Sequence, residues 1–459
     1  MIKERRTSTV LAAMCGMACL GANIAMADGT PVAAPSSSSI LYIRAGAGGT
    51  TCADWANACP TLPRDFRRGV TYYIAAGQYL PADDDFAFRL DAPAQSGMAI
   101  VIKKATAADH GTNDGWQAAY AAGAATFSRM LEINSSNWVI DGQTGGSALY
   151  RWKGDFGFRF VSTAEGDAMI RIGWDSLHGV PVSGISNIAI RHAEIVGMGQ
   201  SSHSGGGTSN DGLAVYGATD VTLSSFRMHG IGRCPFFLSG QNIVIEHGWV
   251  ESFYTGDTHA ELASIWGFAD TFGDVTFRDN LFTDIQSTGG IMWSTKENPS
   301  ARLRIYGNTF YRPAGSTWPA ANGLIGGWTA EAFSNVTVYN NNFVNVDQAS
   351  LSNAPQIHAN NHAYDNLFYD SQAPDFSSYD SHDDNLFIRA GDAQAEPSGV
   401  AIADGTDPFV DAAHFDFRLK APTWAGLKMP PAYDGKDPFG QQRGGDGNWD
   451  RGAFEYRQP

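Results

Sequence analysis

The stretch Asn187-Ile-Ala-Ile recurs along the middle of the chain, and this repetition decides the fold. Each copy alternates apolar with other residues at the period of two that is typical of a β-strand. Successive copies begin 33, 22, 32, 28 and 33 residues apart, which favours a solenoid with one such strand per turn. Because one repeat cannot bury its own apolar face, the copies must stack. The other copies are Asp220-Val-Thr-Leu, Asn242-Ile-Val-Ile, Asp274-Val-Thr-Phe, Arg302-Leu-Arg-Ile and Asn335-Val-Thr-Val.

A second regularity follows the later copies of this strand. An asparagine two residues before a phenylalanine suits a turn, where stacked amides can hydrogen-bond from coil to coil and tolerate left-handed backbone. The phenylalanine then points inward and stacks in a column. Together the two patterns predict an all-β chain folded as a parallel β-helix. The copies are Asn280-Leu-Phe, Asn308-Thr-Phe, Asn341-Asn-Phe and Asn366-Leu-Phe.

The 459 residues divide into four segments, although we expect one elongated body because solenoids grow by adding coils. Residues 1–27 read as a signal peptide, and 28–130 as a linker, an N-terminal cap and the first coils. Residues 131–390 hold the main coils, with second strands between the repeats. Residues 391–459 have little periodicity and are expected to form an irregular C-terminal strap. The Ala-rich stretch 114–125 predicts a short helix over the open end of the core.

The N-terminus carries a secretory signal pattern. Lys3, Arg5 and Arg6 precede an apolar stretch that ends in Ala25-Met-Ala27, so cleavage is expected after Ala27 and the protein is expected to be secreted or periplasmic. The apolar stretch is too short for a membrane span. Lipidation at Cys19 is an alternative, but the residues before it lack the expected leucine.

Three cysteines remain after removal of the signal. Cys52 and Cys59 enclose a short loop and are the natural disulfide pair in an exported protein, which leaves Cys234 unpaired as a small buried residue. The spacing of the cysteines matches no zinc site.

The net charge of −16 argues against nucleic acid or an anionic membrane as a partner. An acidic polysaccharide remains possible, because a local cluster of cationic side chains can bind uronates while the remaining surface stays acidic. We expect a monomer.

The repeated strand and the terminal Asp-Pro-Phe and Asp450-Arg-Gly-Ala-Phe patterns resemble those of secreted bacterial right-handed parallel β-helix proteins of the pectate-lyase-like type. The resemblance covers most of the mature chain. It implies the fold and its handedness, and it suggests carbohydrate chemistry, although the same scaffold carries lyases, hydrolases, epimerases and adhesins.

In a solenoid, side chains on one outward face of successive coils align, so a site is expected as a column. Residues 203–297 gather the densest set of His, Arg, Lys and carboxylates, with Trp293 and Trp328 placed to stack on sugar rings. His203 and Arg227 are further candidate substrate contacts. The candidate catalytic residues are His229, Arg233, His259, Glu261 and Lys296.

The segment Thr255-Gly-Asp-Thr-His-Ala-Glu is the sharpest local signal. His259 and Glu261 are two apart, so both are expected on one face, with His259 as general base or acid and Glu261 orienting it. Lys296 is expected to lie over Glu261. A surface His–Glu pair and a solvated loop lysine are the plainer alternatives, and a role in a turn is the alternative for His229 and for Arg233.

A calcium site is a further possibility, since Asp211, Asp257 and Glu261 could supply an all-oxygen ligand set. Such an ion would neutralise a uronate carboxylate. Aspartates in solenoid turns also serve simply to hydrogen-bond the local backbone.

The favoured function is a polysaccharide lyase that cleaves a uronate-containing exopolysaccharide, such as that of a biofilm matrix, by β-elimination. A polygalacturonase-like hydrolase is the first alternative, suggested by Ser209-Asn-Asp-Gly and Met228-His-Gly, but the adjacent Asp-Asp pair of that pattern is missing. A non-catalytic glycan-binding matrix protein is the second. A C5-epimerase would use much the same residues as a lyase.

Overall fold

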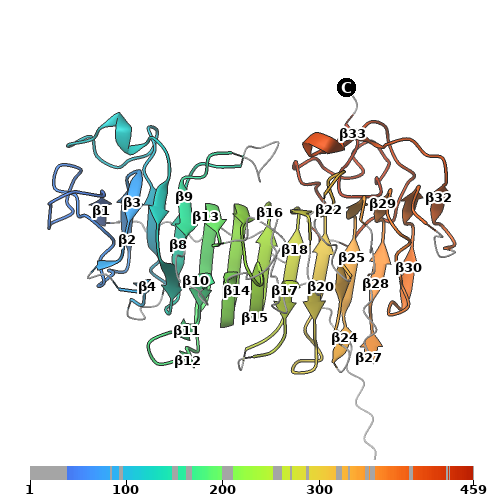
Figure 1. Ribbon diagram of the computed structural model, residues 1–459, viewed down its shortest axis with the longest axis horizontal. Helices are drawn as coiled ribbons and strands as arrows, with labels where there is room; N and C mark the ends of the chain where they lie inside the picture. Colours follow the sequence, from blue (N-terminus) through green and yellow to red (C-terminus); the bar gives the residue numbers. More distant parts are fainter. Residues whose placement is uncertain are drawn as a thin grey trace, which may run out of the picture.

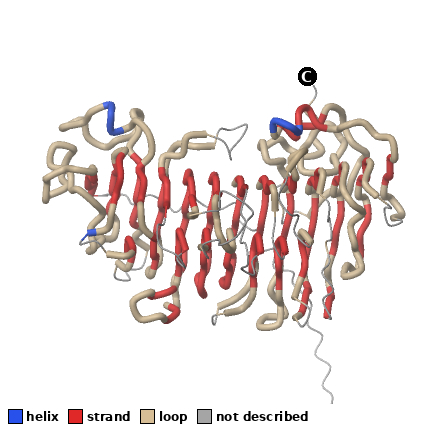
Figure 2. Tube along the Cα trace, viewed as in Figure 1, coloured by secondary structure: helices blue, strands red, loops and turns tan. Residues whose placement is uncertain are grey.

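The structure is a computed structural model, and almost all of its regular elements are short parallel strands (Figure 2). It describes residues 39–82, 85–92, 97–146, 154–161, 168–198, 210–251, 261–268, 271–285, 289–316, 323–328, 331–346, 351, 357–391, 396–430, 433 and 435–457. None of the helices among these residues is long and apolar enough to cross a membrane.

The strands follow one another along a long prism (Figure 1) and form parallel faces, here called sheets A, B and C, of which sheet C ends before the last coils. The predicted parallel β-helix is thereby confirmed. Sheet A contains the repeated stretch. Its strands are β1 (Ser39–Ile43), β2 (Val70–Ile74), β5 (Ile100–Lys104), β8 (Trp138–Asp141), parts of β13 (Ser186–Val196), β14 (Asp211–His229) and β15 (Phe236–Glu246), then β18 (Val275–Arg278), β21 (Leu303–Tyr306), β25 (Val336–Tyr339), β28 (His362–Tyr364) and β30 (Ser381–Asp383).

Sheet B follows sheet A in each coil. It contains β3 (Gly77–Tyr79), β6 (Ala125–Phe127), β9 (Phe158–Val161), the ends of β13 and β14, β16 (Trp249–Glu251), β19 (Leu281–Thr283), β22 (Thr309–Tyr311), β26 (Asn342–Val344), β29 (Leu367–Tyr369), β31 (Leu386–Ile388) and β32 (Val400–Ile402).

Sheet C closes the coil. It contains β4 (Ala87–Leu90), β7 (Met130–Ile133), β10 (Ala168–Ile172), the starts of β14 and β15, β17 (Glu261–Ile265), β20 (Gly289–Trp293) and β23 (Ile325–Gly326). The strands of sheet C from β14 onward are the second strands predicted between the repeats. Three small pairs lie outside the faces: β11 (Trp174–Asp175) with β12 (Val180–Pro181), β24 (Ala332–Ser334) with β27 (Ile357–Ala359), and β33 (Phe409–Asp411) with β34 (Asp416–Leu419).

The corner between sheets A and B carries the predicted asparagine ladder. The Asn341 amide donates to the backbone oxygen of Ile305 at 2.9 Å and to Oδ1 of Asn366 at 3.0 Å, and its own Oδ1 accepts the backbone N–H of Asn308 at 3.0 Å. Stacked phenylalanines accompany the ladder: the rings of Phe343 and Phe368 lie 4.7 Å apart. The buried side-chain amides of the ladder therefore find partners in the neighbouring coils.

The left-handed backbone lies elsewhere than expected. It falls on the residue before the ladder asparagine, as at Asn340 (φ 48°), and on the first residue of the repeated stretch, as at Asn187 (φ 59°) and Asp220 (φ 57°). Asn and Asp tolerate this conformation better than other side chains, which explains why most copies of the repeat begin with one of them.

The predicted Cys52–Cys59 disulfide is confirmed, and it closes a loop over the N-terminal edge of sheet A. Tyr42 of β1 donates its N–H to Cys52 and accepts from the N–H of Cys59, both at 2.9 Å. An uncovered strand edge would otherwise invite pairing with another chain. The predicted helix within 114–125 is only a 3-10 turn, η2 (Ala118–Tyr120).

Replacing both disulfide cysteines with serine is expected to loosen the N-terminal coils and leave the central coils unchanged. The cysteines are seven residues apart, so the chain-entropy estimate is a loss of about 2 to 3 kcal/mol. In a solenoid, each coil contacts only its neighbours, which keeps this loss local. Hydrogen exchange should accelerate in residues 39–74. Cys234→Ala is the control, and equal acceleration in that variant would contradict the prediction.

The C-terminal segment covers the later half of sheet B, where it lies above β22 and β29 with its turn η3 (Ala412–His414) (Figure 1). The outward residues there are apolar, for example Leu281, Tyr311 and Leu367, and pack with Phe417 and Phe454 of this segment in one cluster. Nearer the N-terminus, sheet B instead presents charged residues such as Arg159, Glu194 and Arg227. The segment therefore acts as a strap over the apolar part of the sheet.

Candidate functional site

The outer face of sheet C is the candidate site, and of the residues that the sequence singled out it carries Arg233, Lys296 and Trp328. In its central strands, Leu213, Phe236 and Ala263 point into the core and pair in register with one another. Their neighbours along each strand therefore point outward, which places Phe237 on the outer face. Arg233 lies just before β15, and Lys296 follows the end of β20.

Arg233 is held at the start of this face by Asp211. Its Nε–H donates to Oδ1 of Asp211 at 2.7 Å, and Nη2 donates to Oδ2. The side chain of Asp211 is 8% exposed and that of Arg233 is 34% exposed, so the pair anchors a guanidinium that still reaches solvent. The hydrogen bond from Arg233 to Asp211 raises the pKa of the guanidinium further, so Arg233 remains a cation.

Two aromatic side chains lie near this pair. The guanidinium carbon of Arg233 lies 5.5 Å from the ring centre of Phe237, which is a cation–π distance. Burial raises the pKa of the Tyr216 hydroxyl, and the nearby Asp211 raises it further, while Arg171 and Arg233 lower it. Tyr216 is therefore protonated at neutral pH and lies in the field of the Arg233–Asp211 pair. Tyr216 was not among the residues predicted from the sequence, although the alternation in Leu213-Ala-Val-Tyr216 already indicates that its side chain faces outward.

Glu261 is buried instead of lying in the outward column. Asp211, Cys234 and Glu261 occupy equivalent positions in three successive coils, and the Cys234 thiol lies 3.8 Å from Oε2 of Glu261. Glu261 is only 4% exposed. Burial raises the pKa of the Cys234 thiol well above its usual value, so this cysteine is a protonated, inert residue, as the sequence predicted.

His229 and Arg227 lie on sheet B, around the corner from Arg233. His229 Nε2 hydrogen-bonds to Oε1 of Glu194 at 2.9 Å, and this bond lowers the pKa of the Glu194 carboxyl. Arg227 Nε donates to Oε1 of Glu251 at 2.7 Å. These two candidates therefore belong to a second polar cluster, where the carboxylates of β13 and β16 already bind them.

Lys296 does not lie over Glu261. Glu261 pairs with Gly289 at the first residue of β20, whereas Lys296 comes after the last residue of that strand. Its Nζ lies 3.0 Å from Oε1 of Glu331, and its side chain is 60% exposed. Lys296 thus marks the opposite end of the face from Arg233.

The predicted sugar contact of Trp293 is wrong. Trp293 is fully buried, and its Nε1–H donates to the backbone oxygen of Ser334 at 2.8 Å. The strand period of two places Trp293 on the same inward side as Ile291. The sequence-based prediction of a sugar contact did not take this alternation into account. Trp328 is partly exposed at the end of the same face.

Three candidates, His203, Asp257 and His259, lie outside the described residues. Within the described part of the chain, no three His, Cys, Asp or Glu residues lie close enough to hold a metal ion. Because the proposed calcium site includes Asp257, that site stays a prediction, and the oxygens of Asp211 already bind Arg233.

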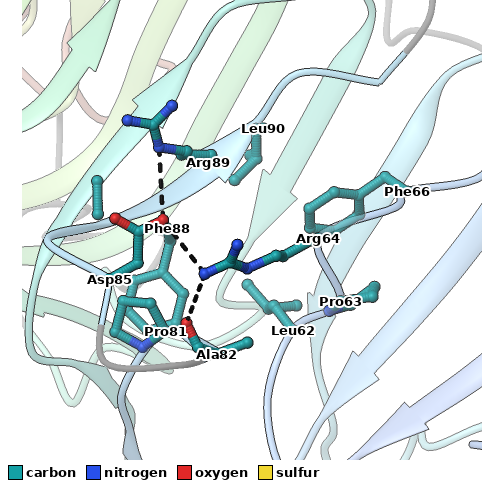
Figure 3. A pocket seen from close by; sticks show the side chains of 11 residues that line it. Leu62, Pro63, Arg64, Phe66, Pro81, Ala82, Asp85, Phe88, Arg89 and Leu90 are labelled. Atoms are coloured by element: carbon teal, nitrogen blue, oxygen red, sulfur yellow. Dashed lines mark hydrogen bonds and ion pairs between the residues drawn. The ribbon is translucent and has the colours of Figure 1, made fainter. Parts of the chain in front are cut away.

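A pocket near the N-terminal end is a poorer candidate (Figure 3). It is an open depression with about 310 Å³ of empty space, part of it bulk solvent, between residues 62–66 and the start of β4. Asp85 lies 3.6 Å from both Arg64 and Arg89, so the charged side chains that line the pocket already pair with one another. None of the residues that the sequence singled out lines it.

No protein-family model matches this chain, and no curated protein matches it. Among solved structures, the chain is similar to the crystal structure of pectate lyase Pel9A, with a TM-score of 0.52 and 12% sequence identity. The match covers 92% of this chain and 98% of that chain. At this identity the likeness concerns the fold alone. The chain is a right-handed parallel β-helix, and it shares this fold with a pectate lyase over almost its whole length.

Proposed function

We propose that this protein is a secreted polysaccharide lyase that cleaves a uronate-containing polysaccharide by β-elimination on the outer face of sheet C. The anchored guanidinium of Arg233 is the observation that carries the proposal. It is partly exposed, permanently charged and held in a fixed orientation by Asp211. An oriented guanidinium is well suited to bind a carboxylate. The fold shared with a pectate lyase adds support.

The reaction requires three functions. Arg233 binds the carboxylate of the uronate and stabilises the charge that develops on it when H5 is removed as a proton. A base takes that proton, the C4–C5 double bond forms, and the C4–O4 bond breaks. The leaving oxygen then takes a proton, and the protonated Tyr216 hydroxyl is our candidate donor. For the base we retain His259, whose role rests on the sequence alone.

The test is the ultraviolet absorbance of an unsaturated uronate end, followed while the mature protein acts on a panel of uronate polysaccharides, with and without EDTA. A rise in absorbance is the expected result, and its loss in EDTA would add a calcium ion to the mechanism. New reducing ends without this absorbance would overturn the lyase in favour of a hydrolase. If the protein binds a polysaccharide but produces neither the absorbance nor new reducing ends on any substrate, it is a non-catalytic glycan-binding protein.

Lys296→Met is expected to have a small effect that appears in KM. The lysine is exposed and paired with Glu331, so it contributes at most one carboxylate contact at the far end of the face. We expect kcat/KM to fall by no more than about fivefold with kcat unchanged, as for a uniform binding contact. Steady-state kinetics on the best substrate provide the measurement. A fall of kcat by two orders of magnitude would instead identify Lys296 as a catalytic residue.

A further inference from the structure

Five aromatic side chains form a continuous rim where the strands of sheet C end. The ring centres of Trp174 and Tyr216 lie 5.0 Å apart, those of Tyr216 and Phe268 lie 5.6 Å apart, and those of Trp266 and Phe268 lie 5.5 Å apart. Phe237 completes the set at 5.5 Å from Tyr216. We call these five residues the aromatic rim.

The rim lies outside the core. Val215, Leu238 and Ile265 fill the inward positions of the same strands, so the rim residues next to them face outward. Phe268 is 44% exposed, and the other four side chains are partly exposed. Soluble proteins seldom leave so large a set of aromatics on one surface unless it binds something.

An apolar surface of this kind continues onto the β11–β12 hairpin beside Trp174. Leu177 at its tip is 61% exposed and Val180 is 47% exposed. A ligand that follows the rim therefore meets mainly aromatic and aliphatic groups, with the cations Arg171 and Arg233 near Tyr216.

The cations described near the rim are few and separate. Arg233 binds Asp211, Arg171 lies in register with Ala214, and Lys296 at the far end of the face binds Glu331. Arg171, nearby in sheet C, donates to the hydroxyl of Ser176 at 2.7 Å. Separate cations on a protein with a net charge of −16 suit isolated carboxylates better than a chain with a carboxylate on every sugar.

We propose that the aromatic rim binds sugar rings that carry no carboxylate, so that the substrate is an acidic heteropolysaccharide in which neutral sugars separate the uronates. The apolar C–H face of a pyranose ring packs on an aromatic ring without requiring charge, while Arg233 binds the uronate beside it. The inference rests on the proposed function only in assigning the uronate to Arg233.

The test compares two probes by isothermal titration calorimetry: gellan, which has one glucuronate in a four-sugar repeat, and polygalacturonate, which has a carboxylate on every ring. We expect gellan to bind at least about tenfold more tightly at low salt. Trp266→Ala and Phe268→Ala should each weaken gellan binding by about tenfold, since stacking is lost. The matched control is Trp424→Ala, which removes a tryptophan that is 50% exposed in the strap.

Circular dichroism melting of each variant reports whether it is folded. If Trp266→Ala unfolds, Phe268→Ala still tests the proposal, because Phe268 is the more exposed residue. Equal or tighter binding of polygalacturonate, or unchanged gellan binding by both rim variants, would overturn the proposal. Ultraviolet absorbance is followed on the same samples. Rim-dependent gellan binding without unsaturated ends would support the rim and overturn the lyase, whereas unsaturated ends from polygalacturonate alone would overturn the rim proposal and leave the lyase standing.

Discussion

Arg233→Met is expected to lower kcat/KM by at least about a hundredfold, because it removes the cation that stabilises the developing charge of the uronate. Arg233→Lys should lose about tenfold, since an ammonium retains the charge but cannot reproduce the bidentate contact with Asp211. The measurement is the rate of formation of unsaturated uronate ends at saturating and at low substrate concentrations.

Arg233→Met also leaves the buried Asp211 carboxylate without its partner, which costs about 3 kcal/mol of stability or more. The double variant Asp211→Asn/Arg233→Met separates the two effects, because it removes the unpaired charge. Its melting temperature should recover most of the loss while its activity stays low. Recovery of activity together with stability would show that Arg233 only maintains the fold, and would contradict its role at the reacting sugar.

The repeat could be predicted from sequence because its signals are local. Alternation within Asn187-Ile-Ala-Ile fixes which side chains face inward, and the spacing of the copies fixes one strand of sheet A per coil. The asparagine ladder followed for the same reason, since each member bonds to its equivalent in the next coil. The left-handed position was misplaced by one residue because it depends on the exact corner geometry.

The site could be predicted only in part, because its contacts join residues that are far apart in the sequence. Asp211 and Arg233 were both singled out, but the sequence could not decide whether Asp211 binds a metal ion or an arginine one coil later. That choice depends on side-chain direction. Trp293 was a different kind of error, since the period of two in Ile291-Met-Trp293 already pointed the indole inward.

Stability is expected to fall as the pH rises from about 4 to about 8, because of a buried carboxyl beneath the strap. Asp365 is fully buried, and its Oδ1 accepts the backbone N–H of Leu427 at 2.8 Å. Burial raises the pKa of Asp365 from 3.8 to about 8. Between these two values the folded protein keeps the proton and the unfolded chain releases it, so each rise in pH favours unfolding.

Asp365→Asn should remove this part of the pH dependence. The amide is neutral at every pH, and its oxygen can still accept from Leu427, so the strap should stay in place. At about 1.4 kcal/mol per pKa unit, the variant should be more stable than the parent by several kcal/mol at pH 9 and by little at pH 4. Chemical denaturation at a series of pH values measures the difference.

Two further variants locate the effect in the strap. Glu455→Gln should remove a smaller share, since burial raises the pKa of Glu455 from 4.5 only to about 7. Asp404→Asn changes an exposed carboxyl of the same segment and should leave the slope unchanged. If Asp365→Asn retains the full slope, the buried carboxyl is not its source. If the double variant of Asp365 and Glu455 removes more of the slope than the two single variants do when added together, the two carboxyls titrate as a coupled pair.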